Sequence, residues 1–337
     1  MRIVGGIALV LALALLVGGW IAFGTYAPLA VDPAWEVAGD RDIPEGALTV
    51  RYTGCATLVF SDGETTWMTD GWFTRPGPLA LGFGEIEPDL AAIDRGLARN
   101  EVTELAAVFP LHSHYDHAMD APEVAERTGA LLLGSESTAN IGRGWGLDES
   151  QIRVVEDRVP VRIGRFVVTP IESKHFAFPD PAFAESALAD PTIAEPLVPP
   201  AGAFAYKVGK AYVLHVAHPK GSFAIVGSAG YVKGGLEGYD ADVVFLGIGA
   251  LGSQTDEYRE AYWHETVDRI GATRVVPIHW DGLTNPIEGP FQGSVRVLTL
   301  VAAGGDDLLR DFLEAKRAAT PERAFFTLPR YDPVVLF

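Results

Sequence analysis

The stretch Ala106-Ala107-Val108-Phe109-Pro110-Leu111-His112-Ser113-His114-Tyr115-Asp116-His117 decides the fold class of this chain. Its first half is apolar and predicts a buried strand, and its second half places three imidazoles and one carboxylate within six residues. Those four side chains would repel and desolvate one another if they were buried without a partner. A cation such as zinc binds imidazole and carboxylate at about 2.0 to 2.2 Å. The stretch therefore predicts a metal site directly after a strand.

Composition narrows the class of protein. The chain has 337 residues, of which 48% are hydrophobic and 21% charged, enough for a packed core. A formal net charge of -18 disfavours nucleic acid as a partner and attracts cations. Cys55 is the only cysteine, so a disulfide within the chain is excluded. Any metal must then be bound by His, Asp or Glu. No feature of the composition indicates the oligomeric state.

The N-terminal segment predicts a membrane anchor. Ile3 to Gly24 contains no charged side chain, and as a helix it would extend about 33 Å against a hydrocarbon core of about 30 Å. A cleaved signal peptide is the alternative, but its apolar region is normally only about 7 to 15 residues long. Arg2 precedes the segment and Asp32 follows it, which predicts a domain outside the cytoplasm, in the periplasm or extracellular space. We expect an anchor or signal peptide at 1–25, a linker at 26–45 and a globular domain at 46–337.

Within the domain, short apolar runs alternate with helix and turn signals. Asp120, followed by Glu123, predicts a capping box at the start of a helix. A proline-rich insertion at 176–204 interrupts the pattern and is expected to be a functional lid or a disordered insertion. Its Phe176, Phe178 and Phe183 are candidates for the floor of an apolar substrate pocket. We expect strands at 48–52, 57–60, 65–69, 161–170, 211–216, 223–226, 243–246 and 274–278, and helices at 88–97, 121–128, 255–270 and 306–319.

Further candidate ligands follow other predicted strands. Asp70-Gly71 ends one strand, His175 closes the run 168–174, and His279 follows the strand 274–278. With these residues in this order, the chain resembles the metallo-β-lactamase superfamily over residues 46 to 290, because HxHxDH is the leading motif of that family. The context of His279 looks like the subgroup that contains L-ascorbate 6-phosphate lactonases and N-acyl-phosphatidylethanolamine phospholipases. The resemblance implies a four-layer αββα sandwich.

The resemblance also implies two adjoining metal sites. Asp70 would hold a ligand imidazole by its second ring nitrogen, as the outer partners of metal ligands commonly do. By resemblance, the first site would consist of His112, His114 and His175, and the second of Asp116, His117 and His279.

One position departs from the family pattern. Members usually carry an Asp that bridges the two metals, within a Gly-Asp pair after the hairpin, and here the pair is Gly227-Ser228. Without that carboxylate the repulsion between two dications is less offset. We therefore expect the first site to be filled more securely than the second. Ser228 is either a partner of a bound water or a small residue in place of a lost ligand.

The residue types suit hydrolysis. Three neutral imidazoles leave a cation its charge and an open position, where a water ionises with a pKa of about 7 rather than about 15.7. Asp116 can accept a proton from that water, and Tyr115 is a candidate donor to an oxyanion or a packing residue. We expect a hydrolase that uses metal-bound hydroxide on an ester, lactone or phosphodiester bond of a small-molecule or lipid-like substrate.

The sequence leaves the metal and two other functions open. Zinc is expected, while iron and manganese accept the same ligands. One alternative is an iron-binding redox protein of the same fold, and another is a non-catalytic scaffold that has lost the bridging carboxylate. Outside the pattern, His218 is expected at the surface, in the hairpin turn far from the ligands, and no role is assigned to His215 or His264.

Overall fold

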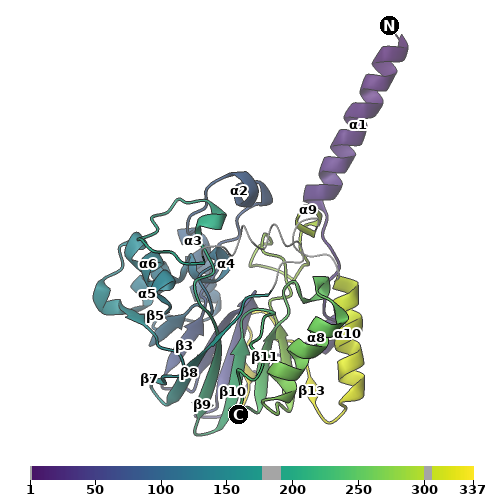
Figure 1. Cartoon of the computed structure of the whole chain (residues 1–337). Coiled ribbons are helices and arrows are strands. Elements are labelled where there is room, and N and C mark those ends of the chain that lie inside the picture. The colour runs from purple at the N-terminus through teal and green to yellow at the C-terminus, as the bar shows by residue number, and fades with distance from the viewer. Residues whose placement is uncertain (1, 177–190, 300–305) are drawn as a thin grey trace.

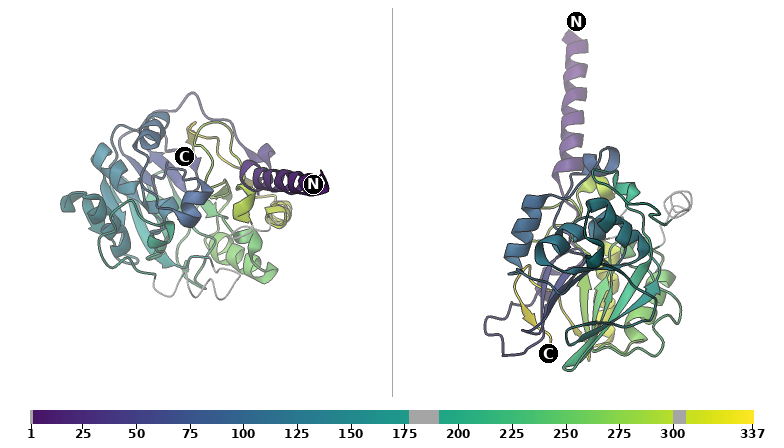
Figure 2. Two further views of the ribbon diagram at one scale, coloured as in Figure 1. Left: turned by 90° about the horizontal axis from the view of Figure 1, so that it is seen from above. Right: turned by 90° about the vertical axis from the view of Figure 1, so that its left-hand side faces the viewer.

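The computed structural model describes residues 2–176, 191–299 and 306–337 (Figure 1). In this part of the chain the strands form two seven-stranded sheets. Helices cover the outer sides (Figures 1 and 2). The first half of the chain builds one side of the sandwich and the second half the other, except that the C-terminal strand at 334–335 joins the first sheet. The predicted α/β sandwich is confirmed.

The first sheet begins as an antiparallel meander and ends with parallel strands. β1, β2 and β3 are antiparallel, as predicted, whereas β3 to β6 run parallel and are connected through helices. The strand order is β14 (Val334–Val335), β1 (Thr49–Gly54), β2 (Thr57–Ser61), β3 (Thr66–Thr69), β4 (Ala107–Phe109), β5 (Leu131–Gly134) and β6 (Ile152–Val154). The helices of this half are α2 (Pro78–Phe83), α3 (Leu90–Arg99), α4 (Tyr115–Ala118), α5 (Ala121–Thr128) and α6 (Glu136–Trp145).

The second sheet repeats this plan. β7 to β10 are antiparallel, and β10 to β13 are parallel. The strand order is β13 (Ala324–Phe325), β12 (Arg274–Ile278), β11 (Val243–Gly247), β10 (Gly221–Val226), β9 (Ala211–His218), β8 (Phe166–Ser173) and β7 (Val161–Ile163). The helices of this half are α8 (Asp256–Trp263), which continues as a π-helical turn at His264–Asp268, the short α9 (Arg296–Thr299) and α10 (Asp306–Ala319).

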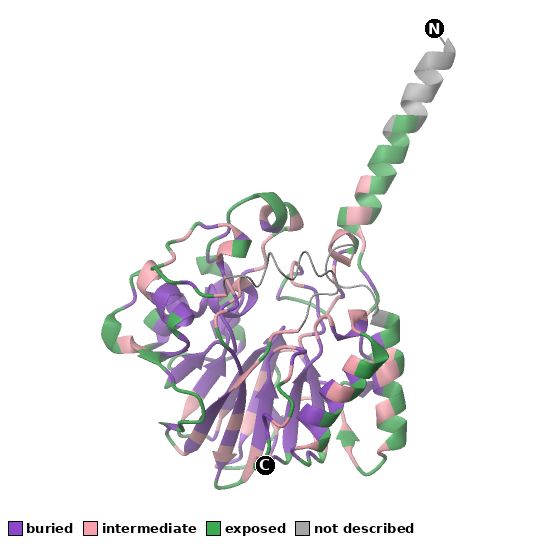
Figure 3. Cartoon of the chain, viewed as in Figure 1, coloured by how far each residue is buried: buried purple, intermediate pink, exposed green. Residues whose placement is uncertain are grey.

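The core lies between the sheets (Figure 3). Because successive strand residues point to opposite faces, Phe60 and Trp67 face the second sheet while their neighbours Val59 and Met68 face the helices. Phe60 stacks on Trp67 and, across the interface, on Phe223, with ring centroids 5.0 and 4.6 Å apart. This apolar contact holds the sheets together and so fixes the edge at which both present their strand ends.

The N-terminal prediction is not supported. Residues 2–24 form the helix α1 (Arg2–Gly24), which precedes the sandwich. In the part of the chain that the structure describes, no helix is both long and apolar enough to cross a membrane.

Two local predictions are wrong because tertiary contacts override them. His218 is buried rather than exposed: its ring packs on Phe166, and its Nε2 lies 3.2 Å from Asp62 Oδ2, since the hairpin tip packs against the turn after β2. The helix α5 begins at Ala121 with Asp120 at its N-cap position, as predicted, but the Asp120 side chain makes no capping hydrogen bond. The Asp120 carboxylate instead accepts the backbone N–H groups of Phe73 and Thr74 and the Thr74 hydroxyl.

The described part of the proline-rich insertion is attached to α6. Ile193 N–H donates to Ser137 Oγ at 3.0 Å, and Leu197 N–H donates to the Asn140 carbonyl at 3.0 Å. Phe178 and Phe183 lie outside the described residues. Phe176 is described and packs on the ring of His175 with centroids 4.1 Å apart.

Candidate metal centre

The candidate ligands meet at one edge of the sandwich. The carboxyl ends of parallel strands share one edge of a sheet, and open α/β folds bind small molecules at that edge. Asp70 follows β3, the HxHxDH motif follows β4, His175 follows β8 and His279 follows β12. Segments that are distant along the chain are therefore brought together by the two sheets.

The first group consists of His112, His114 and His175, whose ligand atoms all lie within 4.8 Å of one another. His112 Nε2 and His114 Nδ1 are 3.1 Å apart. His175 Nδ1 lies 3.1 Å from the Phe176 carbonyl, so a proton on that nitrogen places the lone pair of the ring on Nε2. Burial lowers the pKa of all three rings, to about 4 for His114. All three are neutral near pH 7, as metal ligands must be.

The second group consists of Asp116, His117 and His279. The short helix α4 follows the extended residue His114 and carries Asp116 and His117. His279 Nε2 lies 3.2 Å from His117 Nε2 and 3.3 Å from Asp116 Oδ2. Burial alone would raise the pKa of Asp116, but His117 and His279 outweigh it and hold the pKa well below its usual value. Asp116 is therefore an anion in this group.

Asp70 orients His117. His117 Nδ1–H donates to Asp70 Oδ2 at 2.7 Å, and Leu111 N–H donates to Asp70 Oδ1 at 2.9 Å. With its proton on Nδ1, His117 presents the lone pair of Nε2 to Asp116 and His279. Burial opposes a charge on His117, yet the carboxylates of Asp70 and Asp116 outweigh it and raise its pKa. The structure thus places Asp70 against the imidazole of His117, a candidate ligand, and the role that the resemblance implied for Asp70 stays a prediction.

The donor set fits one or two cations. The rings of His112 and His117 are 3.8 Å apart between centroids, so the two groups adjoin. Within each group two ring nitrogens lie 3.1 and 3.2 Å apart, respectively, which is close enough for one cation to bind both nitrogens of a pair. Imidazole with carboxylate suits zinc, iron and manganese.

Ser228 and Tyr115 lie beside the groups. Ser228 Oγ accepts the Phe176 N–H at 3.1 Å and so fixes the chain directly after His175. Among the described residues Asp116 is the one carboxylate in the two groups, so no other acid takes the place of the bridging Asp. Tyr115 contacts Trp72 edge to face, with centroids 5.9 Å apart, which is a packing contact.

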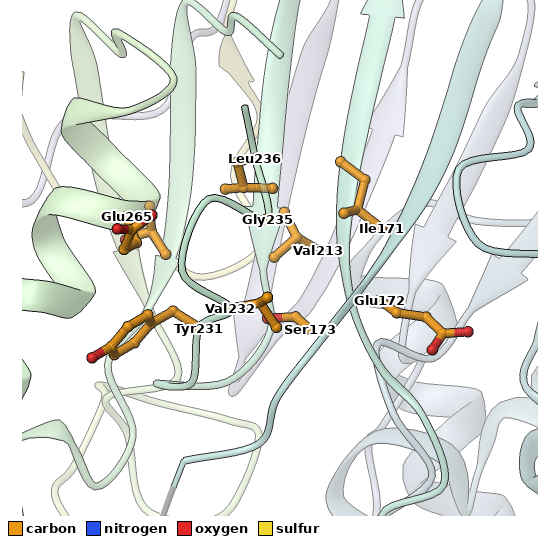
Figure 4. A pocket seen from close by; sticks show the side chains of 10 residues that line it. Ile171, Glu172, Ser173, Val213, Tyr231, Val232, Gly235, Leu236 and Glu265 are labelled. Atoms are coloured by element: carbon orange, nitrogen blue, oxygen red, sulfur yellow. The ribbon is translucent and has the colours of Figure 1, made fainter. Parts of the chain in front are cut away.

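One hollow at the end of β8 is too small for a substrate. It lies between the end of β8 and the segment around Tyr231 and Leu236, with Glu265 at its side (Figure 4). It has room for about one water molecule.

A carboxylate that the sequence did not indicate lies two residues after His279. Asp281 is buried and bonded to the turn between β1 and β2, which in turn contacts His279. Its proximity to His279 in the chain is the only signal in the sequence, because its hydrogen-bond partners Tyr52 and Cys55 are more than 200 residues away.

Two facing sheets with outer helices and His/Asp groups at the strand ends define the metallo-β-lactamase class of fold. Residues 86–280 match the family model described as the beta-lactamase superfamily domain, and the chain belongs to this family. The predicted family is thereby confirmed, whereas the predicted subgroup stays a prediction. No significant match was found among curated proteins.

Comparison with solved structures gives several similar chains, of which one has a TM-score above 0.5. Igni18, a metallo hydrolase from the archaeon Ignicoccus hospitalis, is similar with a TM-score of 0.51 and 13% identity, covering 86% of this chain and 99% of that chain. An isothiocyanate hydrolase from Delia radicum gut bacteria has a TM-score of 0.49 and 15% identity, covering 86% and 98%. CmlA, a diiron β-hydroxylase from Streptomyces venezuelae, has a TM-score of 0.48 and 14% identity, covering 88% of this chain and 55% of that chain. At 13% identity the likeness to Igni18 concerns the fold alone.

Proposed function

We propose that the protein is a metal-dependent hydrolase acting on an ester, lactone or phosphodiester bond. The observation that carries the proposal is the convergence of five imidazoles and one carboxylate into two adjoining groups at the strand ends. These residues would hold a divalent cation, which when bound would supply Lewis acidity and would lower the pKa of a water to about 7. Zinc is the proposed metal, with iron and manganese as the other candidates for the same donors.

The residues of the chain divide the remaining work. His112, His114 and His175 are neutral near pH 7 and supply lone pairs. Asp116 is the catalytic candidate, since its ionised carboxylate can accept a proton from a water and orient that water toward a substrate carbonyl or phosphoryl group. Asp70 holds the proton of His117 on Nδ1.

The bond classes follow from the similarity of the His279 segment to the lactonase and phospholipase subgroup. The proposed substrates are therefore small lactones and phosphodiesters, and esters with an acyl chain. The net charge of -18 argues against nucleic acid among the phosphodiesters.

The test combines metal analysis with a substrate panel. Purified full-length protein is assayed for bound zinc, iron and manganese and for hydrolysis of lactones, phosphodiesters and acyl esters. His112→Ala should lose both metal and activity, while Asp116→Asn should reduce kcat/KM by about 10²- to 10⁴-fold. His264→Ala is the matched control, because that side chain is 63% exposed on the π-helical turn. Full activity in metal-free protein, or absence of bound metal, would overturn the proposal.

A further inference from the structure

His279 reaches the second group from an unfavourable backbone conformation. Its φ is +59°, in the left-handed region that side chains with a Cβ rarely adopt. Such a residue persists only where its surroundings hold it in place. Gly249 is part of those surroundings, since a Cβ there would lie 2.8 Å from His279 Nδ1. The position of the His279 ring is therefore imposed by the surrounding structure.

The holding contacts come from the opposite sheet. His279 N–H donates to the Cys55 carbonyl at 2.6 Å and lies 3.3 Å from the Tyr52 hydroxyl oxygen. Tyr52 and Cys55 belong to β1 and to the turn before β2, whereas His279 follows β12. The candidate ligand His279, which follows a strand of the second sheet, is thus hydrogen-bonded to the backbone of the first sheet.

Asp281, two residues after His279, also hydrogen-bonds to the Tyr52–Cys55 turn. Its Oδ1 accepts the Cys55 N–H at 2.6 Å and lies 3.3 Å from the Tyr52 hydroxyl. Gly54 allows this close approach, because a Cβ there would lie 2.5 Å from Asp281 Oδ2. The amide of Cys55 is held by Asp281 while its carbonyl holds His279, so the two segments form a closed ring of hydrogen bonds.

We propose that Asp281 is a positioning residue for the second ligand group, acting through the Tyr52–Cys55 turn on the placement of His279. This inference rests on the proposed function, because it requires that the second ligand group binds a cation. His279 Nε2 lies 3.2 Å from His117 Nε2 and 3.3 Å from Asp116 Oδ2, so a shift of the turn changes both distances. The ligands of the first group follow β4 and β8 and none of them follows β12, so the effect is selective for the second group.

The experiment measures cation binding rather than activity. Metal-free full-length wild type, Asp281→Asn and Asp281→Ala are titrated with Zn²⁺ by calorimetry and with Co²⁺ by absorption, which reports the ligand set of each site. We expect two binding steps in the wild type. In Asp281→Ala the second step should weaken by about 10- to 100-fold, the usual effect of removing an outer partner of a metal ligand, while the first changes by less than threefold. Asp281→Asn retains one acceptor oxygen and should weaken the second step less.

Two further variants provide a control for general loss of stability and an independent change to the contacts between Asp281 and His279. Asp62→Asn changes another fully buried carboxylate, bonded to Arg165 and His218 away from the ligands, and should reduce stability without altering either binding step. Tyr52→Phe removes only the hydroxyl that lies between Asp281 and His279, and it should weaken the second step even if Asp281 variants fail to fold. Unchanged binding in folded Asp281→Ala, an equal loss at both steps, or a single step in the wild type would overturn the inference. Binding of no cation at all would refute the proposed function instead.

Discussion

Replacing Asp70 by Asn tests the role of one proton on His117. The carboxylate accepts two N–H groups, from His117 Nδ1 at 2.7 Å and from Leu111 at 2.9 Å. An amide has one acceptor oxygen and one NH2 donor. If the oxygen remains on Leu111, the NH2 faces His117 Nδ1 and requires a lone pair there, which moves the imidazole proton to Nε2. If the oxygen turns to His117, the NH2 opposes the Leu111 N–H. Each arrangement spoils one of the two contacts.

The magnitude follows from which atom is affected. A proton on Nε2 removes the lone pair that His117 offers to the second group, whereas His112, His114 and His175 keep theirs. We expect the affinity of the second binding step to fall about 10- to 100-fold, or about 1.4 to 2.7 kcal/mol. The unpaired buried group should lower the free energy of unfolding by about 1 to 3 kcal/mol.

Competitive titration of Zn²⁺ against a chelator, with urea unfolding of the metal-free protein, separates the two effects. His264→Ala serves again as the exposed control. An Asp70→Asn protein that loses stability but binds the second cation as tightly as the wild type would refute the tautomer argument. A loss of equal size at both binding steps would show general loosening of the site instead.

Three further predictions concern the sandwich. The pKa of Asp62 is held well below its usual value, because Arg165, backbone N–H groups and His218 outweigh the effect of burial. The stability that its carboxylate contributes is present at neutral pH and is lost as the pH falls below about 4. Urea unfolding of Asp62→Asn at several pH values should therefore show a weaker loss of stability in acid. Burial raises the pKa of Asp120 to about 6, so between about pH 4 and 6 the folded chain keeps a proton that the unfolded chain has lost. The stability that this proton contributes is therefore lost as the pH rises from about 4 to 6. Asp120→Asn should remove that fall in the same assay. Phe60→Ala, which empties the aromatic stack, should cost about 3 to 5 kcal/mol in urea unfolding.

Local sequence patterns were sufficient for most of the secondary structure. Short strand-like runs separated by turn signals predicted β1, β2 and β3, and the helix over 121–128 was placed at its observed residues. These runs are buried along most of their length because one strand face meets the opposite sheet and the other meets helices. The capping box at Asp120 failed because that carboxylate has stronger partners in a loop distant along the chain.

The proposed ligands were also accessible from the sequence, though unequally. His112, His114, Asp116 and His117 lie within six residues, so a tight turn and one short helix are enough to group them. His175 and His279 needed the family resemblance, since a single His after a strand is common. Burial of His218 could not be foreseen, because it depends on which turn of the first sheet meets the hairpin tip.

The sequence by itself determined most strands and helices and the cluster of His112, His114, Asp116 and His117, because these depend on short-range patterns and on spacing within a few residues. The family resemblance that this cluster carries then supplied the sandwich, His175 and His279. Only the tertiary structure decided how His279 is held. Its partners Tyr52 and Cys55 lie more than 200 residues earlier, and their contact with Asp281 exists only after both sheets have formed and packed. Hydrogen bonds at that separation have no periodic signature in the chain, since they arise from the packing of two surfaces rather than from the conformation of one segment.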